Sequence, residues 1–188
     1  MMHKEVPNIL TYSRIFIIPL ILFLMFFLDS YFVSKITSLL FLIASFTDFL
    51  DGFIARKFNI QSRLGRILDP IADKILVVTV LVMLVYQGKA DLLPAMAIIV
   101  REVVVSGLRE FLSELKVSVP VSNLSKVKTF FQMFALLLLI LGNNGIEELE
   151  LESFGNLVLW LSAFLTVISG YVYFRESLKY INQGSNVR

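Results

Sequence analysis

Long apolar runs constrain this chain more than any other feature of its sequence. Six of them approach the roughly 20 residues that an α-helix needs to cross a bilayer. Hydrophobic residues make up 57% of the 188 residues, whereas charged residues make up only 17%. Because only helices and closed barrels satisfy their backbone hydrogen bonds in lipid, and because the runs do not alternate, we expect helices. The expected spans cover residues 10–28, 33–55, 67–87, 92–112, 127–142 and 153–174.

The sequence therefore predicts an all-α integral membrane protein with six transmembrane helices, built as a single domain over residues 1–188. A short interfacial helix over residues 1–9 is compatible with the polar start of the chain. The first apolar run follows Lys4, as in a signal peptide. No small-residue cleavage pattern follows Phe27, however, so we interpret this run as a retained helix.

Lysine and arginine residues are distributed very unevenly between the two ends of these helices. With both termini placed in the cytoplasm, 15 of the 17 basic residues lie on or near the cytoplasmic side. Only Lys35 and Lys89 lie on the other side, together with the acidic segment 143–152. The positive-inside rule therefore predicts that both termini are cytoplasmic.

The chain contains no cysteine and a single histidine, His3. The lack of cysteine excludes disulfides, thiolate zinc sites and cysteine nucleophiles. A metal site in this chain has to be built from oxygen ligands. Carboxylates suit hard divalent cations such as Mg²⁺ or Mn²⁺.

Four carboxylates lie near the adjoining ends of the second and third expected spans. They belong to Asp48, Asp51, Asp69 and Asp73. A charge near the centre of a membrane helix costs at least about 2–3 kcal/mol, so these residues need a common function. The two acids of each span are three or four residues apart and lie on one side of the helix. If the two sides meet, roughly two divalent cations are needed to relieve the repulsion between the carboxylates.

Small residues and an arginine accompany these acids. Gly52, Ala55 and Gly65 leave room for a ligand near the backbone, and Arg56 offers paired donors that suit a pyrophosphate. Carboxylates, metal ions and an arginine are the groups that phosphoryl transfer requires. The structural alternative is a salt-bridge network with neighbouring arginines, but such a network does not need this spacing of glycine and alanine.

The spacing of these residues forms a motif. It reads Asp48-x2-Asp51-Gly52-x2-Ala55-Arg56-x8-Gly65-x3-Asp69-x3-Asp73. At every fixed position the motif resembles that of the CDP-alcohol phosphotransferase family. The resemblance implies an enzyme that transfers a phosphatidyl group from a CDP-activated lipid to a small alcohol. It also implies that all four aspartates bind metal, and that Asp73 is in addition the catalytic general base.

The same resemblance implies a set of residues that bind the CDP-lipid. Gly52 and Arg56 match positions that contact the CDP group. Ser62 is a candidate for a hydroxyl in the linking loop that assists in this binding. Asn8, Thr11 and Arg14 are three residues apart on one face of the first span, which favours a functional role for Arg14. The expected CDP-lipid ligands are Thr11, Arg14, Gly52, Ala55, Arg56 and Ser62.

Four further stretches resemble the bacterial members of that family that use glycerol 3-phosphate as acceptor. They are PNILTYSRIFIIP, LDPIADK, REVVVSGLRE and LSKVKTFFQM. Basic residues near the cytoplasmic ends of the fourth and fifth spans suit the phosphate of such an acceptor. They are Arg101, Arg109, Lys126 and Lys128. Inositol phosphate or another alcohol is the alternative acceptor, and any one of these basic residues is also explained by the positive-inside rule.

The expected ligands are thus CDP-diacylglycerol, glycerol 3-phosphate and membrane lipid, without nucleic acid, and we expect a homodimer. The bacterial resemblance favours the cytoplasmic (inner) membrane, with the active site facing the cytoplasm. A cation transporter is the alternative from another class, because membrane carboxylates also mark ion pathways. The acids lie toward one end of two helices, however, and no inverted repeat is visible. A non-catalytic assembly factor is the third hypothesis.

Overall fold

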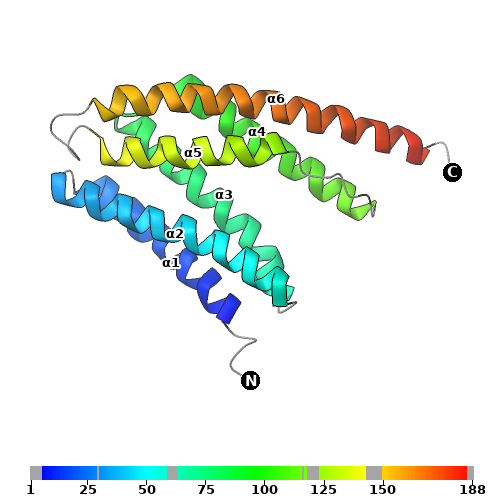
Figure 1. The fold of residues 1–188 in the computed structure, drawn as a ribbon, viewed down its shortest axis with the longest axis horizontal. Coiled ribbons are helices and arrows are strands. Elements are labelled where there is room, and N and C mark those ends of the chain that lie inside the picture. The colour runs from blue at the N-terminus through cyan, green and yellow to red at the C-terminus, as the bar shows by residue number, and fades with distance from the viewer. Residues whose placement is uncertain are drawn as a thin grey trace.

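The computed structural model describes residues 6–28, 30–58, 63–115, 117, 123–142 and 150–185. For residues 6–15, 31, 48–58, 63–67, 69–70, 123 and 182–185 it describes the backbone alone. The described secondary structure is entirely α-helical (Figure 1). Its elements are α1 (Val6–Phe27), α2 (Tyr31–Phe58), α3 (Arg63–Tyr86), α4 (Leu92–Glu114), α5 (Asn123–Leu141) and α6 (Leu151–Ser185). The predicted all-helical fold is confirmed, and each helix overlaps one predicted span.

The ends of two helices differ from the prediction. Residues 6–9 form the start of α1 and not a separate helix, whereas residues 1–5 lie outside the described part of the chain. Helix α6 continues to Ser185, 11 residues beyond the predicted end at residue 174. Hydropathy marks where an apolar run ends, but the polar residues after residue 174 are still compatible with helix.

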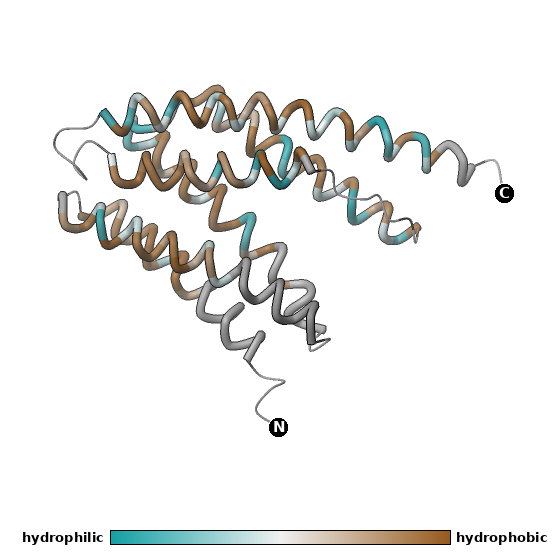
Figure 2. Tube along the Cα trace, in the orientation of Figure 1, coloured by the Kyte–Doolittle hydropathy of each residue, from teal (hydrophilic) through white to brown (hydrophobic). Residues whose placement is uncertain are grey.

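The surface of the described helices is rich in large apolar side chains. Phe16, Phe32 and Leu93 are 78%, 70% and 70% exposed. Brown apolar segments dominate the central parts of the helices in Figure 2. Two stretches, Leu124–Leu141 and Leu151–Ile181, are long and apolar enough to cross a bilayer. Soluble monomers rarely expose so much apolar surface, so the surface is that of a membrane protein. The six spans and the side of the termini stay predictions.

The helices pack around a core to which all six contribute completely buried side chains, including Ala44 of α2. Those of Ile21, Leu81, Ile98, Leu136 and Leu159 come from α1, α3, α4, α5 and α6 in turn. Helix α6 packs against both α4 and α5. Its packed side carries small hydroxyl residues at helical spacing, namely Ser162, Thr166, Ser169 and Ser177. Small residues let membrane helices approach closely, so α6 holds α4 and α5 in register.

Helix α6 also fixes the connection between α3 and α4. Asn156 accepts a hydrogen bond from the Asp91 backbone N–H at 2.9 Å and donates one to the Lys89 carbonyl at 2.8 Å. The indole N–H of Trp160, one turn further along α6, donates to the Asp91 carboxylate at 2.8 Å. Gly88 provides the left-handed turn after α3, with a φ of 72°. These contacts set the direction in which α4 leaves α3.

Replacing Asn156 with alanine removes both hydrogen bonds to this connection. We expect Asn156→Ala to lower the free energy of unfolding by about 1–3 kcal/mol, because two backbone groups lose their partner. Thermal unfolding of the purified protein in detergent measures the effect. Leu157→Ala is the matched control, since Leu157 is the next residue and is 64% exposed. Equal losses in the two variants would contradict the role of Asn156.

Candidate functional site

The four aspartates of the motif lie at matching distances from the connection between α2 and α3. Asp51 is seven residues before the end of α2, and Asp69 is six residues after the start of α3. Asp48 and Asp73 are each ten residues from these same helix ends. Since α2 and α3 are joined by a short connection and contact each other, positions equally far from it lie at similar heights. The backbone therefore places Asp51 at about the same height as Asp69, and Asp48 at about the same height as Asp73.

Most of the predicted metal and CDP-lipid ligands have no described side chain. Asp48, Asp51, Gly52, Ala55 and Arg56 lie on α2, Asp69 on α3, and Thr11 and Arg14 on α1, each with its backbone alone described. Ser62 lies outside the described residues. Among the side chains that are described, no three acidic or histidine groups gather around a metal position. The roles assigned to these residues stay predictions.

Asp73 is the one motif aspartate whose side chain is described, and it is half-buried on α3. Its carboxylate lies close enough to Lys128 of α5 to attract that ammonium group electrostatically. This attraction connects the predicted general base on α3 with the predicted acceptor-binding residues. Asp73 and Lys128 are 55 positions apart in the sequence, so only the fold brings them near each other.

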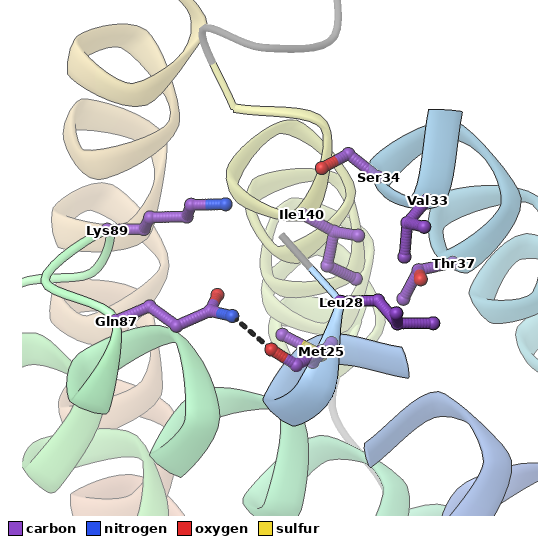
Figure 3. Close-up of a pocket in the computed structure, with 8 residues that line it drawn as sticks. All are labelled: Met25, Leu28, Val33, Ser34, Thr37, Gln87, Lys89 and Ile140. Atoms are coloured by element: carbon purple, nitrogen blue, oxygen red, sulfur yellow. Dashed lines mark hydrogen bonds between the residues drawn. The ribbon is translucent and has the colours of Figure 1, made fainter. Parts of the chain in front are cut away.

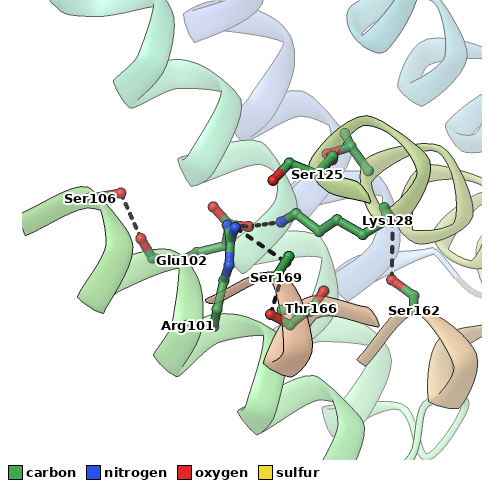
Figure 4. A network of polar contacts seen from close by, with 9 residues as sticks. Arg101, Glu102, Ser106, Ser125, Lys128, Ser162, Thr166 and Ser169 are labelled. Atoms are coloured by element: carbon green, nitrogen blue, oxygen red, sulfur yellow. Dashed lines mark hydrogen bonds and ion pairs between the residues drawn. The ribbon is translucent and has the colours of Figure 1, made fainter. Parts of the chain in front are cut away.

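Two of the four predicted acceptor-binding residues meet inside the helix bundle. Lys128 is 4% exposed, and its ammonium group pairs with Oε1 of Glu102 on α4. The same Oε1 lies 2.9 Å from Nη1 of Arg101. Nη2 of Arg101 in turn lies 3.5 Å from the Ser169 hydroxyl on α6 (Figure 4). One carboxylate thus joins two cations between α4, α5 and α6.

Several buried polar atoms around this cluster have no hydrogen-bond partner among the described residues. They are Nε of Arg101, the Thr166 hydroxyl and Oε1 of Gln132. Gln132 is 3% exposed and lies one turn after Lys128 on α5. Buried polar atoms are nearly always hydrogen-bonded, so those without a protein partner mark a place for water or a polar ligand.

The other two predicted acceptor-binding residues lie at the surface. Arg109 is exposed, and its guanidinium carbon is 5.7 Å from the centre of the Tyr173 ring. Lys126 is exposed on α5, two residues before Lys128 and therefore on nearly the opposite side of the helix. The structure thus joins Arg101 and Lys128 through Glu102 and places Arg109 and Lys126 apart from that pair.

Sequence reasoning missed the residue that makes room for Arg101. A Cβ atom added to Gly170 of α6 would lie 2.9 Å from Cγ of Arg101. The glycine therefore lets the arginine side chain pass α6 on its way to Glu102. The sequence carries no sign of this, because Gly170 and Arg101 belong to helices far apart in the chain. Glycine amid apolar residues is the one hint available.

A small pocket lies at the opposite end of α3. It is lined by Met25, Ser34, Thr37, Gln87, Lys89 and Ile140, among others (Figure 3). The Gln87 amide donates to the Met25 carbonyl at 2.5 Å. Gln87 is 14 residues from Asp73, which corresponds to roughly 20 Å along a helix. The pocket is therefore too far from Asp73 to share its chemistry.

Replacing Gly170 with alanine tests whether the glycine positions Arg101. We expect Gly170→Ala to lower the free energy of unfolding by about 1–3 kcal/mol, because the new methyl group collides near the start of the arginine side chain. Gly107→Ala on α4 is the control, since a Cβ atom there would meet nothing within 4 Å. That control should be neutral or slightly stabilising, as alanine favours helix. Thermal unfolding distinguishes the two, and a stable Gly170→Ala would contradict the close approach.

Comparison with known proteins finds relatives over nearly the whole chain. A sequence model of the family described as CDP-alcohol phosphatidyltransferase matches residues 4–168. A protein of Rickettsia felis, named CDP-diacylglycerol–glycerol-3-phosphate 3-phosphatidyltransferase, is 51% identical over 94% of this chain and 97% of its own length. Proteins of the same name from Rickettsia typhi and Bacillus subtilis are 50% and 38% identical, over 94% and 92% of this chain and 99% and 95% of their own. The chain therefore belongs to the CDP-alcohol phosphatidyltransferase family of membrane enzymes.

Proposed function

We propose that this enzyme transfers the phosphatidyl group of CDP-diacylglycerol to glycerol 3-phosphate, which gives phosphatidylglycerol phosphate and CMP. The observation that carries the proposal is the identity of about half of all residues, over nearly the full length, to proteins named for that reaction. The hypothesis of a cation transporter is rejected, because the family whose model matches is one of phosphatidyltransferases.

The paired cations Arg101 and Lys128 support an acceptor that carries a phosphate. Arg101 and Lys128 contact the same carboxylate oxygen, so they are close enough to contact one phosphate group together. A neutral alcohol would give these cations no matching anion, and serine would offer them a carboxylate instead of a phosphate. Inositol phosphate would, and it is therefore the alternative acceptor.

We further propose that Asp48, Asp51, Asp69 and Asp73 hold divalent cations, Mg²⁺ or Mn²⁺, of which two fit four carboxylates. The donor set suits such ions, because the chain offers carboxylates on two joined helices and no cysteine. When bound, the ions supply positive charge for the pyrophosphate and for the charge that develops in the transfer.

The proposed reaction assigns a role to each of these groups. Asp73 takes the proton from the primary hydroxyl of the acceptor, while Arg101 and Lys128 hold its phosphate. The hydroxyl oxygen attacks the phosphorus next to the lipid and forms the new ester bond. The bond from that phosphorus to the bridging oxygen breaks, and its electrons leave with CMP. Arg56 offers paired donors to the departing phosphate.

We place this site on the cytoplasmic side of a bacterial inner membrane, in a homodimer. The positive-inside distribution of lysine and arginine supports the orientation, and both glycerol 3-phosphate and CMP are soluble. The exposed apolar side chains leave ample surface for lipid and for a second copy.

The direct test is CMP release from CDP-diacylglycerol by the purified protein with Mg²⁺. Glycerol 3-phosphate, inositol phosphate and serine are supplied one at a time. We expect release with glycerol 3-phosphate alone, abolished by a chelator. Asp73→Asn should lower kcat by at least about a hundredfold, because the variant cannot accept the proton. Release with inositol phosphate instead would keep the family reaction and contradict this acceptor.

The absence of cysteine makes the orientation testable with single introduced thiols. Ser30, between α1 and α2, and Ser113, near the end of α4, are both exposed. In intact cells, a membrane-impermeant maleimide should label Ser30→Cys and should label Ser113→Cys only after the membrane is broken. The reverse pattern would contradict cytoplasmic termini, and labelling of both in intact cells would contradict the number of spans between them.

A further inference from the structure

One carboxylate occupies the position between the two cations of the proposed acceptor site, of which Lys128 is buried and Arg101 partly buried. Glu102 Oε1 contacts Lys128 and lies 2.9 Å from Nη1 of Arg101, so both cations have an anionic partner before any substrate binds (Figure 4). Lys128 is almost fully buried, and Arg101 repels it electrostatically. Two like charges held together away from water are strongly unfavourable unless an anion lies between them.

We propose that Glu102 is a built-in counter-anion: it holds Arg101 and Lys128 together in the empty site and is displaced by the phosphate of the acceptor. The inference rests on the proposed function for the identity of this ligand. It assigns Glu102 a positioning role, since the glutamate acts through the two cations and does not touch the reacting atoms.

The charges favour displacement over sharing. Arg101, Lys128 and Glu102 together carry a single net positive charge, and Asp73, which also attracts Lys128, adds negative charge nearby. A phosphate monoester brings a charge of about −1.5 to −2 at pH 7. If the phosphate shares the cations with Glu102, negative charge remains in excess in a buried place. If Glu102 moves away, the phosphate and the two cations are close to neutral together.

The surroundings of Glu102 are compatible with such a movement. Among the described residues, its carboxylate is hydrogen-bonded to the two cations only, whereas Ser106 donates to its backbone carbonyl at 2.6 Å. The side chain can therefore turn away without loss of a further partner. Nε of Arg101 and the Thr166 hydroxyl, both buried without a partner among the described residues, can donate to the oxygens of an incoming phosphate.

Glu102→Gln tests the proposal, because glutamine keeps the shape of the side chain and removes its charge. We expect the variant without ligand to unfold at a lower temperature than the wild type, and inorganic phosphate or glycerol 3-phosphate to raise that temperature by more than in the wild type. We also expect the KM for glycerol 3-phosphate to fall by at least about threefold, with the KM for CDP-diacylglycerol unchanged. Glu114→Gln, at an exposed position of the same helix, is the control and should change none of these values.

A KM for glycerol 3-phosphate that is unchanged or raised, together with a phosphate-induced shift no larger than that of the wild type, would overturn the proposal. Glu102→Asp covers the case in which the glutamine variant does not fold. It keeps the charge but withdraws the carboxylate by one methylene group, and should change the same quantities in the same direction by less. If the wild type uses no glycerol 3-phosphate, the proposed acceptor is wrong, and the phosphate-induced shifts alone still decide the role of Glu102.

Discussion

The compensation of charge inside an apolar helix bundle is the constraint on which this structure depends. Lys128 is 4% exposed, in a helix that is long and apolar enough to cross a bilayer. An unpaired ammonium in such a place is very costly, so α5 can pack here only because Glu102 of α4 supplies a carboxylate. The aspartates of α2 and α3 pose the same problem with opposite sign, and divalent cations are the proposed solution. In the proposed function, both groups of charge bind phosphates of the substrates.

The fold brings these two groups of charge toward each other. Asp73 of α3 attracts Lys128 of α5, and Lys128 pairs with Glu102 of α4. Helix α6 completes the arrangement, because Ser169 lies beside Arg101 and Gly170 leaves space for its side chain. In the proposed function, Asp73 therefore lies near the residues that bind the phosphate of the acceptor. A transferase needs this proximity between its base and the group that positions the nucleophile.

The sequence predicts the helices well and the contacts between them poorly, for physical reasons. Apolar runs must be helical in lipid, so all six helices follow from composition, whereas the end of α6 does not, since its last polar turns leave the apolar run. The spacing of Asp48, Asp51, Asp69 and Asp73 is local and needs no knowledge of packing. The pairing of Lys128 with Glu102 joins residues 26 positions apart on separate helices, and nothing local specifies it. Gly170 has a role only once α4 lies against α6.

The binding of Mn²⁺ tests the central claim that the four motif aspartates hold the divalent cations of a phosphatidyl transfer. Electron paramagnetic resonance counts the bound ions and detects their proximity, in the purified protein supplied with CDP. The account predicts two Mn²⁺ ions per chain, close enough to broaden each other's signals, and the loss of at least one ion in Asp69→Asn. Binding of no ion, or binding that Asp69→Asn leaves unchanged, would contradict it.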